Sequence, residues 1–196
     1  MPWHQNNTNT GGALTQTQIE DNAYEMLGFF TDQGWSDACI AGMFGNIESE
    51  GVFNPAQWQI GKIVGDWYGP DTGYGMYQFT PPYKYHPNYT SAHGININDA
   101  ASNGVGQCQW VIDTPSQWSS AARMAQFFAE EDPGEAAKIW MLYWERPGDQ
   151  SPAAQAYRAS RGEWWYEWIA GHPYHKGPPA WLLFKMSQNW RRIILK

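Results

Sequence analysis

The sequence contains few charged residues and almost no cysteine. Charged residues make up 16% of its 196 residues and hydrophobic residues 42%, which is typical of a globular domain rather than a disordered chain. The two cysteines, Cys39 and Cys108, form no CxxC pair and have no metal-ligand spacing. No phosphate-binding loop or supported Ser/His/Asp arrangement is present either. We therefore expect no metal site and no cofactor, while a Cys39–Cys108 disulfide is neither required nor excluded by the spacing.

Positive charge and long apolar runs are also scarce. The 12 Lys and Arg residues against 19 Asp and Glu give a net charge of -7, which argues against a general nucleic-acid-binding protein. No apolar run approaches the roughly 18 residues that would cross a membrane, and the polar N-terminus lacks the apolar core of a signal peptide. We therefore expect no transmembrane segment and no signal peptide, so a substrate outside the cytoplasm would require some other means of delivery.

Aromatic residues, in contrast, are abundant. The chain holds 13 Trp and 11 Tyr, and aromatic faces stack on the C–H faces of sugar rings. This composition suits a carbohydrate-binding cleft. The alternative is that the rings build the core and protein interfaces, and for most of the tryptophans we expect this second role.

Composition divides the chain into three parts. Residues 1–14 are rich in Asn, Thr and Gly and predict a flexible arm. Residues 15–171 form the folded domain, and residues 172–196 form a basic, apolar tail. The tail suits packing on the body or docking to a partner protein, with an anionic surface as the alternative binding target.

Apolar spacing and capping residues predict a mainly helical domain. The first helix begins after Thr15 or Thr17, and the second runs from Ser36 to Gly51. Further helices are expected over residues 105–113, 116–129, 134–145 and 153–169.

Between these helices, glycine and aromatic residues alternate from residue 54 to 82 and predict a small β-hairpin or loop lobe. Residues 83–104, with Asn103-Gly104 as a turn signal, are predicted as loop. Parallel βαβ alternation is absent. The fold class is therefore α+β and predominantly α, with a helical lobe and a small β-hairpin or loop lobe.

The second predicted helix ends on a carboxylate. Ile40, Met43 and Ile47 precede Glu50 at helical spacing, so Glu50 continues an apolar stripe, whereas Glu48 should face water. Burial and the negative end of the helix dipole would both raise the pKa of Glu50. A carboxylic acid that stays protonated near neutral pH is what a glycosidase uses as its general acid. The alternative is an ordinary solvated glutamate near a helix end.

Three sequence blocks in a fixed order carry a resemblance to a known family. They are Gly45-Asn46-x-x-Ser49-Glu50, then Gly73-x-Gly75-x-x-Gln78-Phe79-Thr80, then Trp144-Glu145-Arg146-Pro147. With these blocks the chain resembles the tail-type lysozymes of bacteriophages, especially the tail-knob lysozyme domains of short-tailed phages, over about residues 20–170.

The resemblance implies a lysozyme-like fold, with the substrate cleft between a helical lobe and a β-hairpin lobe. It also implies cleavage of the β-1,4 glycan strand of peptidoglycan, with Glu50 as the catalytic acid. Two departures from the family pattern stand out. Gly51 replaces a small hydroxyl residue that often follows the acid, and residues 83–104 do not align clearly.

A glycosidase often uses a second carboxylate across the cleft. Asp66 and Asp71 lie 16 and 21 residues after Glu50 in the predicted lobe and are the candidates, to stabilise an oxocarbenium ion or orient water. Both could equally be turn residues. A further alternative is a single Glu that works with the substrate's own hydroxyl or acetamido group.

The expected substrate-binding residues lie mainly in the second block. Gln78 suits hydrogen bonding to a sugar hydroxyl or N-acetyl group, and Trp58 and Tyr77 suit stacking on sugar rings. Phe79 and Thr80 are further candidates. By contrast, we expect Glu145-Arg146-Pro147 to brace the cleft through an ion pair or cap, and His172 and His175 to be loop residues without a metal.

The sequence therefore predicts a peptidoglycan glycan-strand hydrolase. The alternatives are lytic transglycosylase chemistry, and a non-catalytic wall-binding or structural virion protein. Besides peptidoglycan, partners could be phage tail proteins bound through the N-terminal arm or the C-terminal tail. The location would be the virion tail, or the host cytoplasm before lysis if the protein is an endolysin.

Overall fold

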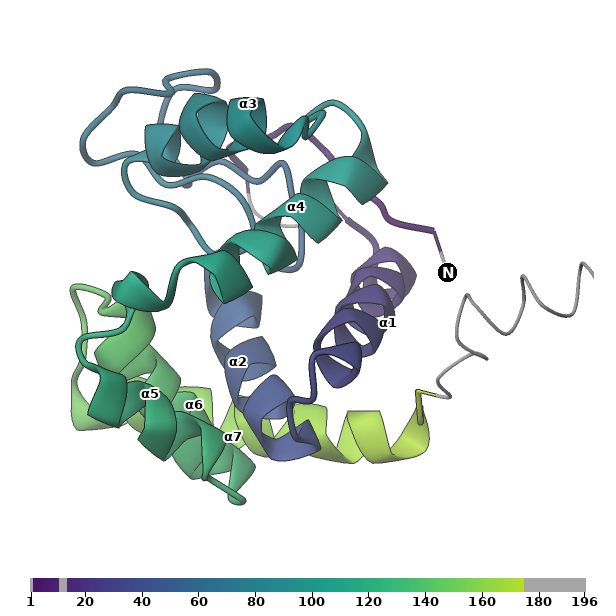
Figure 1. Cartoon of the computed structure of the whole chain (residues 1–196), viewed down its shortest axis with the longest axis vertical. Helices are drawn as coiled ribbons and strands as arrows, with labels where there is room; N and C mark the ends of the chain where they lie inside the picture. The colour runs from purple at the N-terminus through teal and green to yellow at the C-terminus, as the bar shows by residue number, and fades with distance from the viewer. Residues whose placement is uncertain (1, 11–13, 175–196) are drawn as a thin grey trace, which may run out of the picture.

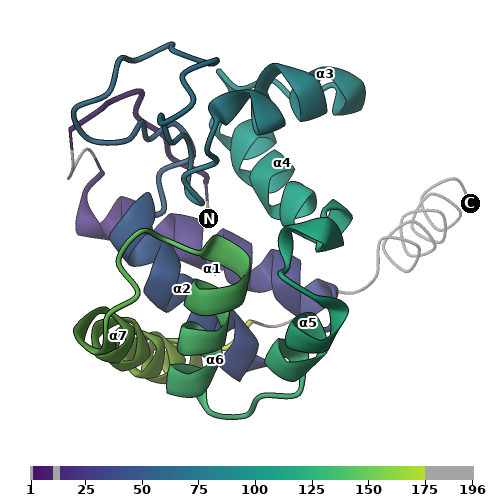
Figure 2. The same cartoon turned by 90° about the vertical axis from the view of Figure 1, so that its left-hand side faces the viewer.

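The computed structural model describes residues 2–10 and 14–174, and these residues are mostly helical. Figure 1 shows α2 (Asp37–Glu50) at the centre of the molecule, with α1 (Gln16–Asp32) beside it and α5–α7 below. A long loop region and the short helix α3 (Thr90–His93) lie above, and Figure 2 shows α4 (Ala100–Asp113) descending from them toward α5. The remaining helices are α5 (Ala121–Phe128), α6 (Pro133–Trp140) and α7 (Pro152–Gly171). Four short helical turns complete the described elements: η1 (Pro82–Lys84) and η2 (Tyr85–Tyr89) before α3, η3 (Pro115–Gln117) before α5, and η4 (Met141–Glu145) after α6. The predominantly helical, lysozyme-like fold is confirmed.

Helix α2 is the core of the fold. Ser36 caps its N-terminus by accepting a hydrogen bond from the Cys39 backbone N–H, and every residue from Ala38 to Ile47 is buried. A helix that is buried all round must be covered by neighbours on each side. Small residues make this covering close, because a Cβ on Gly45 would lie 2.6 Å from the backbone N of Gly162 in α7.

The region between α2 and α4, residues 52–99, forms what we call the loop lobe. Among the described residues it contains no regular strand, only isolated bridges that join Trp58 to Tyr74, Tyr74 to Phe79, and Gln57 to Thr8 of the N-terminal segment. Side chains from α4 hold this lobe instead. Gln107 donates to the carbonyl of Pro55 (2.7 Å) and accepts from the backbone N–H of Met76 (2.9 Å). The loop alternative of the sequence prediction therefore describes this lobe better than a β-hairpin.

The prediction of loop over residues 83–104 was wrong for much of that segment. It contains η1, η2, α3 and the first residues of α4, whose cap is Asp99. The Asn103-Gly104 turn signal misled because both residues serve packing inside α4. Asn103 is buried and donates to the carbonyl of Pro55 (3.0 Å), while Gly104 leaves room for the ring of Trp3.

The predicted flexible arm is largely tied to the body. Buried Asn22 exchanges two hydrogen bonds with the His4 backbone (2.7 Å each), and buried Asn54 does the same with the backbone of Asn6 (2.8 and 3.0 Å). Each amide side chain mimics a backbone partner, so the polar composition that predicted flexibility instead supplies a specific seat. Residues 11–13 and the predicted tail beyond residue 174 lie outside the described residues.

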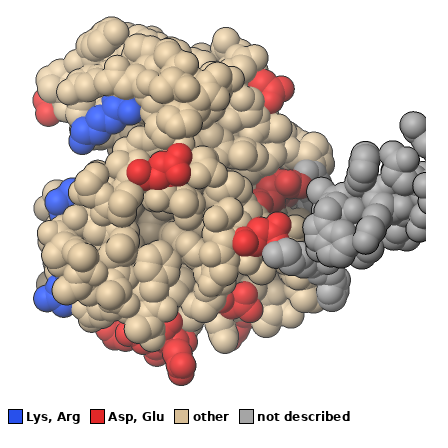
Figure 3. All heavy atoms as spheres, viewed as in Figure 1, with Lys and Arg blue, Asp and Glu red and all other residues tan. Residues whose placement is uncertain are grey.

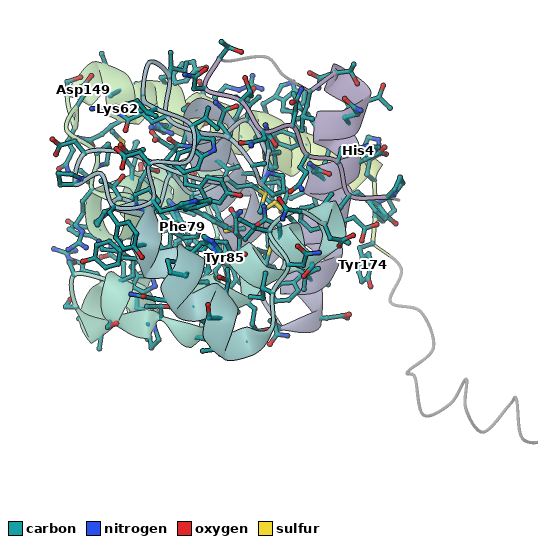
Figure 4. The ribbon with its side chains drawn as sticks, turned by 90° about the horizontal axis from the view of Figure 1, so that it is seen from above. His4, Lys62, Phe79, Tyr85, Asp149 and Tyr174 are labelled. Carbon is teal, nitrogen blue, oxygen red and sulfur yellow. The ribbon has the colours of Figure 1, made fainter. Side chains whose placement is uncertain are left out.

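Aromatic rings fill much of the core, within each lobe and where the lobes meet. Phe79 and Tyr85, labelled in Figure 4, stack with their centroids 5.0 Å apart, and Trp140 and Trp144 stack at 4.2 Å. Cys39 and Cys108 are both buried free thiols, so no disulfide joins them. The tryptophan excess therefore mainly builds the core, as the alternative in the sequence analysis held.

The close approach of α2 and α7 predicts that Gly45→Ala destabilises the fold. The added methyl group would meet backbone atoms of Gly162 and Arg158 at 2.6 and 2.8 Å, and backbone cannot move aside as a side chain can. We expect a loss of about 1–3 kcal/mol in the free energy of unfolding, typical of overpacking, measured by urea denaturation. Gly171→Ala, where no atom lies within 4 Å of the new Cβ, is the matched control and should be nearly neutral. Equal stability of both variants would contradict the close packing.

Candidate active site

A cleft of about 650 Å³ opens between the helical lobe and the loop lobe, which is within the usual range for a binding pocket. Figure 3 shows the notch between the two lobes, with basic side chains on either side of it. The walls come from every part of the fold: Ser49, Glu50, Gln59, Ile60, Tyr77, Gln78, Phe79, Thr80, Lys84, Trp110, Gln117, Trp144, Glu145, Arg146, Pro147 and Gly148.

Glu50 is the last residue of α2 and lines this cleft. The helix stops there because Gly51 caps it, and a Cβ on Gly51 would lie 2.6 Å from the carbonyl oxygen of Gly75 and from the Cα of Met76. A hydroxyl residue at this position would therefore push the loop lobe away. Gly51 therefore allows the close contact between the loop lobe and the end of α2.

The Glu50 carboxylate is held by an arginine that the sequence analysis did not single out. Arg158 of α7 is only 7% exposed, and its Nη2 donates to Glu50 Oε1 at 2.6 Å. The same nitrogen donates to Glu145 Oε1 at 3.2 Å, while Nη1 donates to the carbonyl of Asn46 at 2.6 Å. One guanidinium therefore joins the end of α2, the end of η4 and the middle of α7.

Glu145 is the more deeply placed of the two carboxyl groups, with a side chain 9% exposed against 26% for Glu50. Burial raises the pKa of the Glu145 carboxyl well above its ordinary value. The neighbouring Glu50 carboxylate adds to the rise through its charge and as an acceptor for the protonated form, whereas Arg158 opposes it. Glu145 therefore stays protonated at pH values where an exposed glutamate has ionised.

Glu48 is only partly exposed to water, with 27% of its side chain accessible, rather than fully solvated as predicted. Its two carboxylate oxygens accept from Arg161 Nε (2.7 Å) and Nη2 (2.9 Å), and Trp165 Nε1 donates to it at 3.0 Å. The prediction failed because α7 lies along that side of α2. This bidentate pair secures α7 on α2 and keeps Glu48 out of the cleft.

Neither candidate for the second carboxylate lines the cleft. The Asp66 carboxylate turns back toward Gly69 and Thr72 within its own loop, and Asp71 is exposed. Among the described residues, the carboxyl group that lines the cleft together with Glu50 is that of Glu145, which the sequence analysis had assigned to bracing. Its ion pair is indeed present, but with Arg158 rather than Arg146. The available signal was its position, since Glu145, like Glu50, ends a helical segment.

The predicted substrate-binding residues separate into two groups. Gln78 and Thr80 line the cleft and reach its surface, although Gln78 Nε2 also donates to the carbonyl of Gly75 at 2.8 Å. Tyr77 and Phe79 line it too but are almost fully buried. Trp58 does not line it. Its ring packs on Trp67 and Tyr74, and its Nε1 donates to Asn7 Oδ1, so it is a core residue.

Sequence reasoning missed several other residues of the cleft wall. Trp110 and Trp144 form apolar floor, and Gln59 and Gln117 present amide groups. Lys84 and Arg146 add positive charge at the edges. Within residues 2–10 and 14–174, no group of three or more His, Cys, Asp and Glu side chains is arranged to hold a metal ion. His172 lies in this range and His175 lies outside it.

Comparison with known proteins places this sequence in a family. A family model described as phage tail lysozyme matches residues 21–169, more than half of the chain. The chain belongs to the phage tail lysozyme family. Its members form a lysozyme-like, peptidoglycan-degrading class of phage proteins. The resemblance stated from the sequence blocks is thereby confirmed.

One curated relative is morphogenesis protein 1 of Bacillus phage B103. It is 28% identical over 163 residues, which cover 81% of this chain and 42% of the relative. The chain thus spans less than half the length of this relative. The family match ends within α7, so it includes Glu50, Glu145 and Arg158. No helix among the described residues is long and apolar enough to span a bilayer.

The buried Glu145 predicts a specific dependence of stability on pH. Its pKa is raised in the folded state above the unfolded value of about 4.3, so the folded protein binds more protons and loses stability as pH rises through this window. Glutamine mimics the protonated form. Between pH 4 and pH 7 the wild type should therefore lose stability relative to Glu145→Gln, measured by urea denaturation at each pH. Glu131→Gln, at an exposed position, is the control, and a constant difference between wild type and Glu145→Gln would contradict the prediction.

Proposed function

We propose that this protein cleaves the β-1,4-linked glycan strand of peptidoglycan, with Glu50 as the general acid. The observation that carries the proposal is the position of Glu50, a half-buried carboxyl group fixed by Arg158 at the wall of the cleft between the lobes. Membership of the phage tail lysozyme family supports the substrate class.

In this reaction, Glu50 gives its proton to the glycosidic oxygen as the bond to the sugar carbon breaks. The positive charge that develops on the ring is then captured by water, which yields a reducing end. Capture by the sugar's own hydroxyl would instead yield a 1,6-anhydro end. Asp66 and Asp71 lie outside the cleft, so we propose no carboxylate nucleophile from the loop lobe.

The cleft offers matching groups for an amino-sugar polymer. Gln59, Gln78 and Gln117 present amides that can bond hydroxyl and N-acetyl groups. The positive charges of Lys84 and Arg146 suit the carboxylates of muramic acid and its attached peptides. We propose that one glycan strand lies along the cleft, between the loop lobe and the end of α2.

The family and the name of the relative, a phage morphogenesis protein, support a proposal for the place of action. We propose that the protein is a virion component of the tail that opens the cell wall. Tail proteins would contact it through the N-terminal residues or through residues 172–196. Detection of the protein by antibody in purified particles would support this location. Absence of the protein from the particles would favour a cytosolic endolysin.

The assignment of Glu50 predicts a large loss of activity in Glu50→Gln, which keeps shape but removes the acid. General acid catalysis typically contributes 10²–10⁴-fold, so glycan release from purified cell walls should fall by roughly that factor. Glu131→Gln is the control. Glu131 is exposed and lies outside the cleft, so this variant should keep the wild-type activity. Similar activity of Glu50→Gln and the wild type would refute the assignment, and wild-type binding to walls without fragment release would favour a structural role.

The bond and the capture step are read from the products. We expect mass spectrometry of digested peptidoglycan to find glycan fragments with reducing ends, because water has access to the open cleft. Anhydro ends would show that the reaction is transglycosylation and not hydrolysis. Released peptides with intact glycan strands would show that a different bond is cut.

A further inference from the structure

Two carboxyl groups of the cleft share one nitrogen atom. Arg158 Nη2 donates to Glu50 Oε1 at 2.6 Å and to Glu145 Oε1 at 3.2 Å. The Arg158 and Glu145 side chains are 8% and 9% exposed, so little water reaches the space between them. This arrangement is richer than the single ion pair that is needed to anchor an acid.

The charges of this cluster do not balance if both carboxyl groups are ionised. Arg158 supplies one positive charge, and two carboxylates so close together in a partly dry site cannot readily both ionise. The other charged groups around them do not restore the balance. Arg146 turns its Nη2 to the carbonyl of Gln117, Lys84 lies across the cleft on η1, and Arg161 is occupied by Glu48. The arrangement therefore favours a pair that retains one proton.

The proton rests on the more buried member of the pair. Glu50 is more exposed and receives the shorter bond from Arg158. Glu145 is drier and receives the longer bond. The raised pKa of Glu145 agrees with this distribution. A general acid that rests as the ionised partner of an arginine needs a source for the proton it delivers.

We infer that Glu145 is a positioning residue for the acid, which holds beside Glu50 the proton that Glu50 delivers to the glycosidic oxygen. The inference rests on the proposed role of Glu50 and adds to it the residue that keeps the acid loaded. It also gives Arg158 two alternating partners rather than one.

The O–H bond of Glu145 breaks while one forms on Glu50, and Arg158 then pairs with the new Glu145 carboxylate. Glu50 passes this proton to the glycosidic oxygen, which leaves with the electron pair of the broken C–O bond. The water or hydroxyl group that captures the sugar cation loses a proton, and this proton returns to the Glu50–Glu145 pair. Arg158 keeps its charge throughout.

The test is the pH dependence of kcat in Glu145→Gln. Without the second carboxyl group, only Arg158 acts on Glu50 and favours its ionised form, so the alkaline limb of the profile should move to lower pH. At neutral pH, kcat should fall roughly tenfold for each pH unit of that movement, KM should change little, and activity should recover toward wild type in acid. Glu145→Asp, which restores a carboxyl group, should return the limb toward its wild-type position.

A merely structural role for Glu145 would lower the rate by one factor at every pH, and this result would overturn the inference, as would an unchanged profile. The proposed function is tested separately by Glu50→Gln. If that variant is inactive and the Glu145→Gln profile is not displaced, only the inference fails. If Glu50→Gln is active, the assignment of the acid fails.

A second measurement covers the case in which Glu145→Gln does not fold. Carbon-13 NMR of the glutamate carboxyl groups, in the wild type and in Glu50→Gln, follows the titration of Glu145 directly. Removal of the Glu50 charge should move the Glu145 titration to lower pH. An identical titration in both proteins would show that the two groups share no proton, and would overturn the inference.

Discussion

The buried guanidinium of Arg158 is the interaction on which the cleft depends. From α7 it reaches two segments that are distant in the sequence, α2 through the carbonyl of Asn46 and the carboxyl group of Glu50, and η4 through the carboxyl group of Glu145. Loss of one partner of such a buried cluster is expensive, because the charges left behind have no water to solvate them. The cluster therefore ties the orientation of the acid to the integrity of the helical lobe.

Arg158 can reach these partners because the backbone of α7 lies close against α2 at Gly45, where a Cβ would meet the backbone N of Gly162 at 2.6 Å. The Glu48–Arg161 pair secures the two helices. A glycine also allows close contact at the end of α2, where the backbone of Gly75 and Met76 lies against Gly51. Small residues thus fix both walls of the cleft relative to Glu50, one from the helical lobe and one from the loop lobe.

Local sequence signals predicted the features that are themselves local. The apolar stripe that ends at Glu50 and the glycines that follow it located the end of α2 and one wall of the cleft. Arg158 lies 108 residues from Glu50, and no periodicity connects the two. Their pairing is a consequence of how α7 packs, which a single sequence does not display.

The errors have the same origin. Glu48 was expected in water because the prediction had no information on α7, and Trp58 was expected to stack on sugars although Trp67 and Tyr74 enclose it. The polar N-terminal residues predict flexibility, yet the side-chain amides of Asn22 and Asn54 form hydrogen bonds to the backbone of His4 and Asn6. Asn103 predicts a turn, yet it is buried in α4 and donates a hydrogen bond to the carbonyl of Pro55. In each case a tertiary partner decided the role of the residue.

If Glu50 is the general acid, as we propose, the cluster also meets two opposing demands on its carboxyl group. It must be held in one orientation, which an arginine does best, and it must carry a proton, which an arginine disfavours. The end of α2 makes the first demand more pressing, because the negative end of the helix dipole repels a carboxylate there. A second carboxyl group on the same arginine meets both demands, since the proton stays within the cluster while the arginine holds whichever group is ionised. In the proposed mechanism, this explains why Glu145 takes the drier position and Glu50 the wall of the cleft, where the glycan strand would lie.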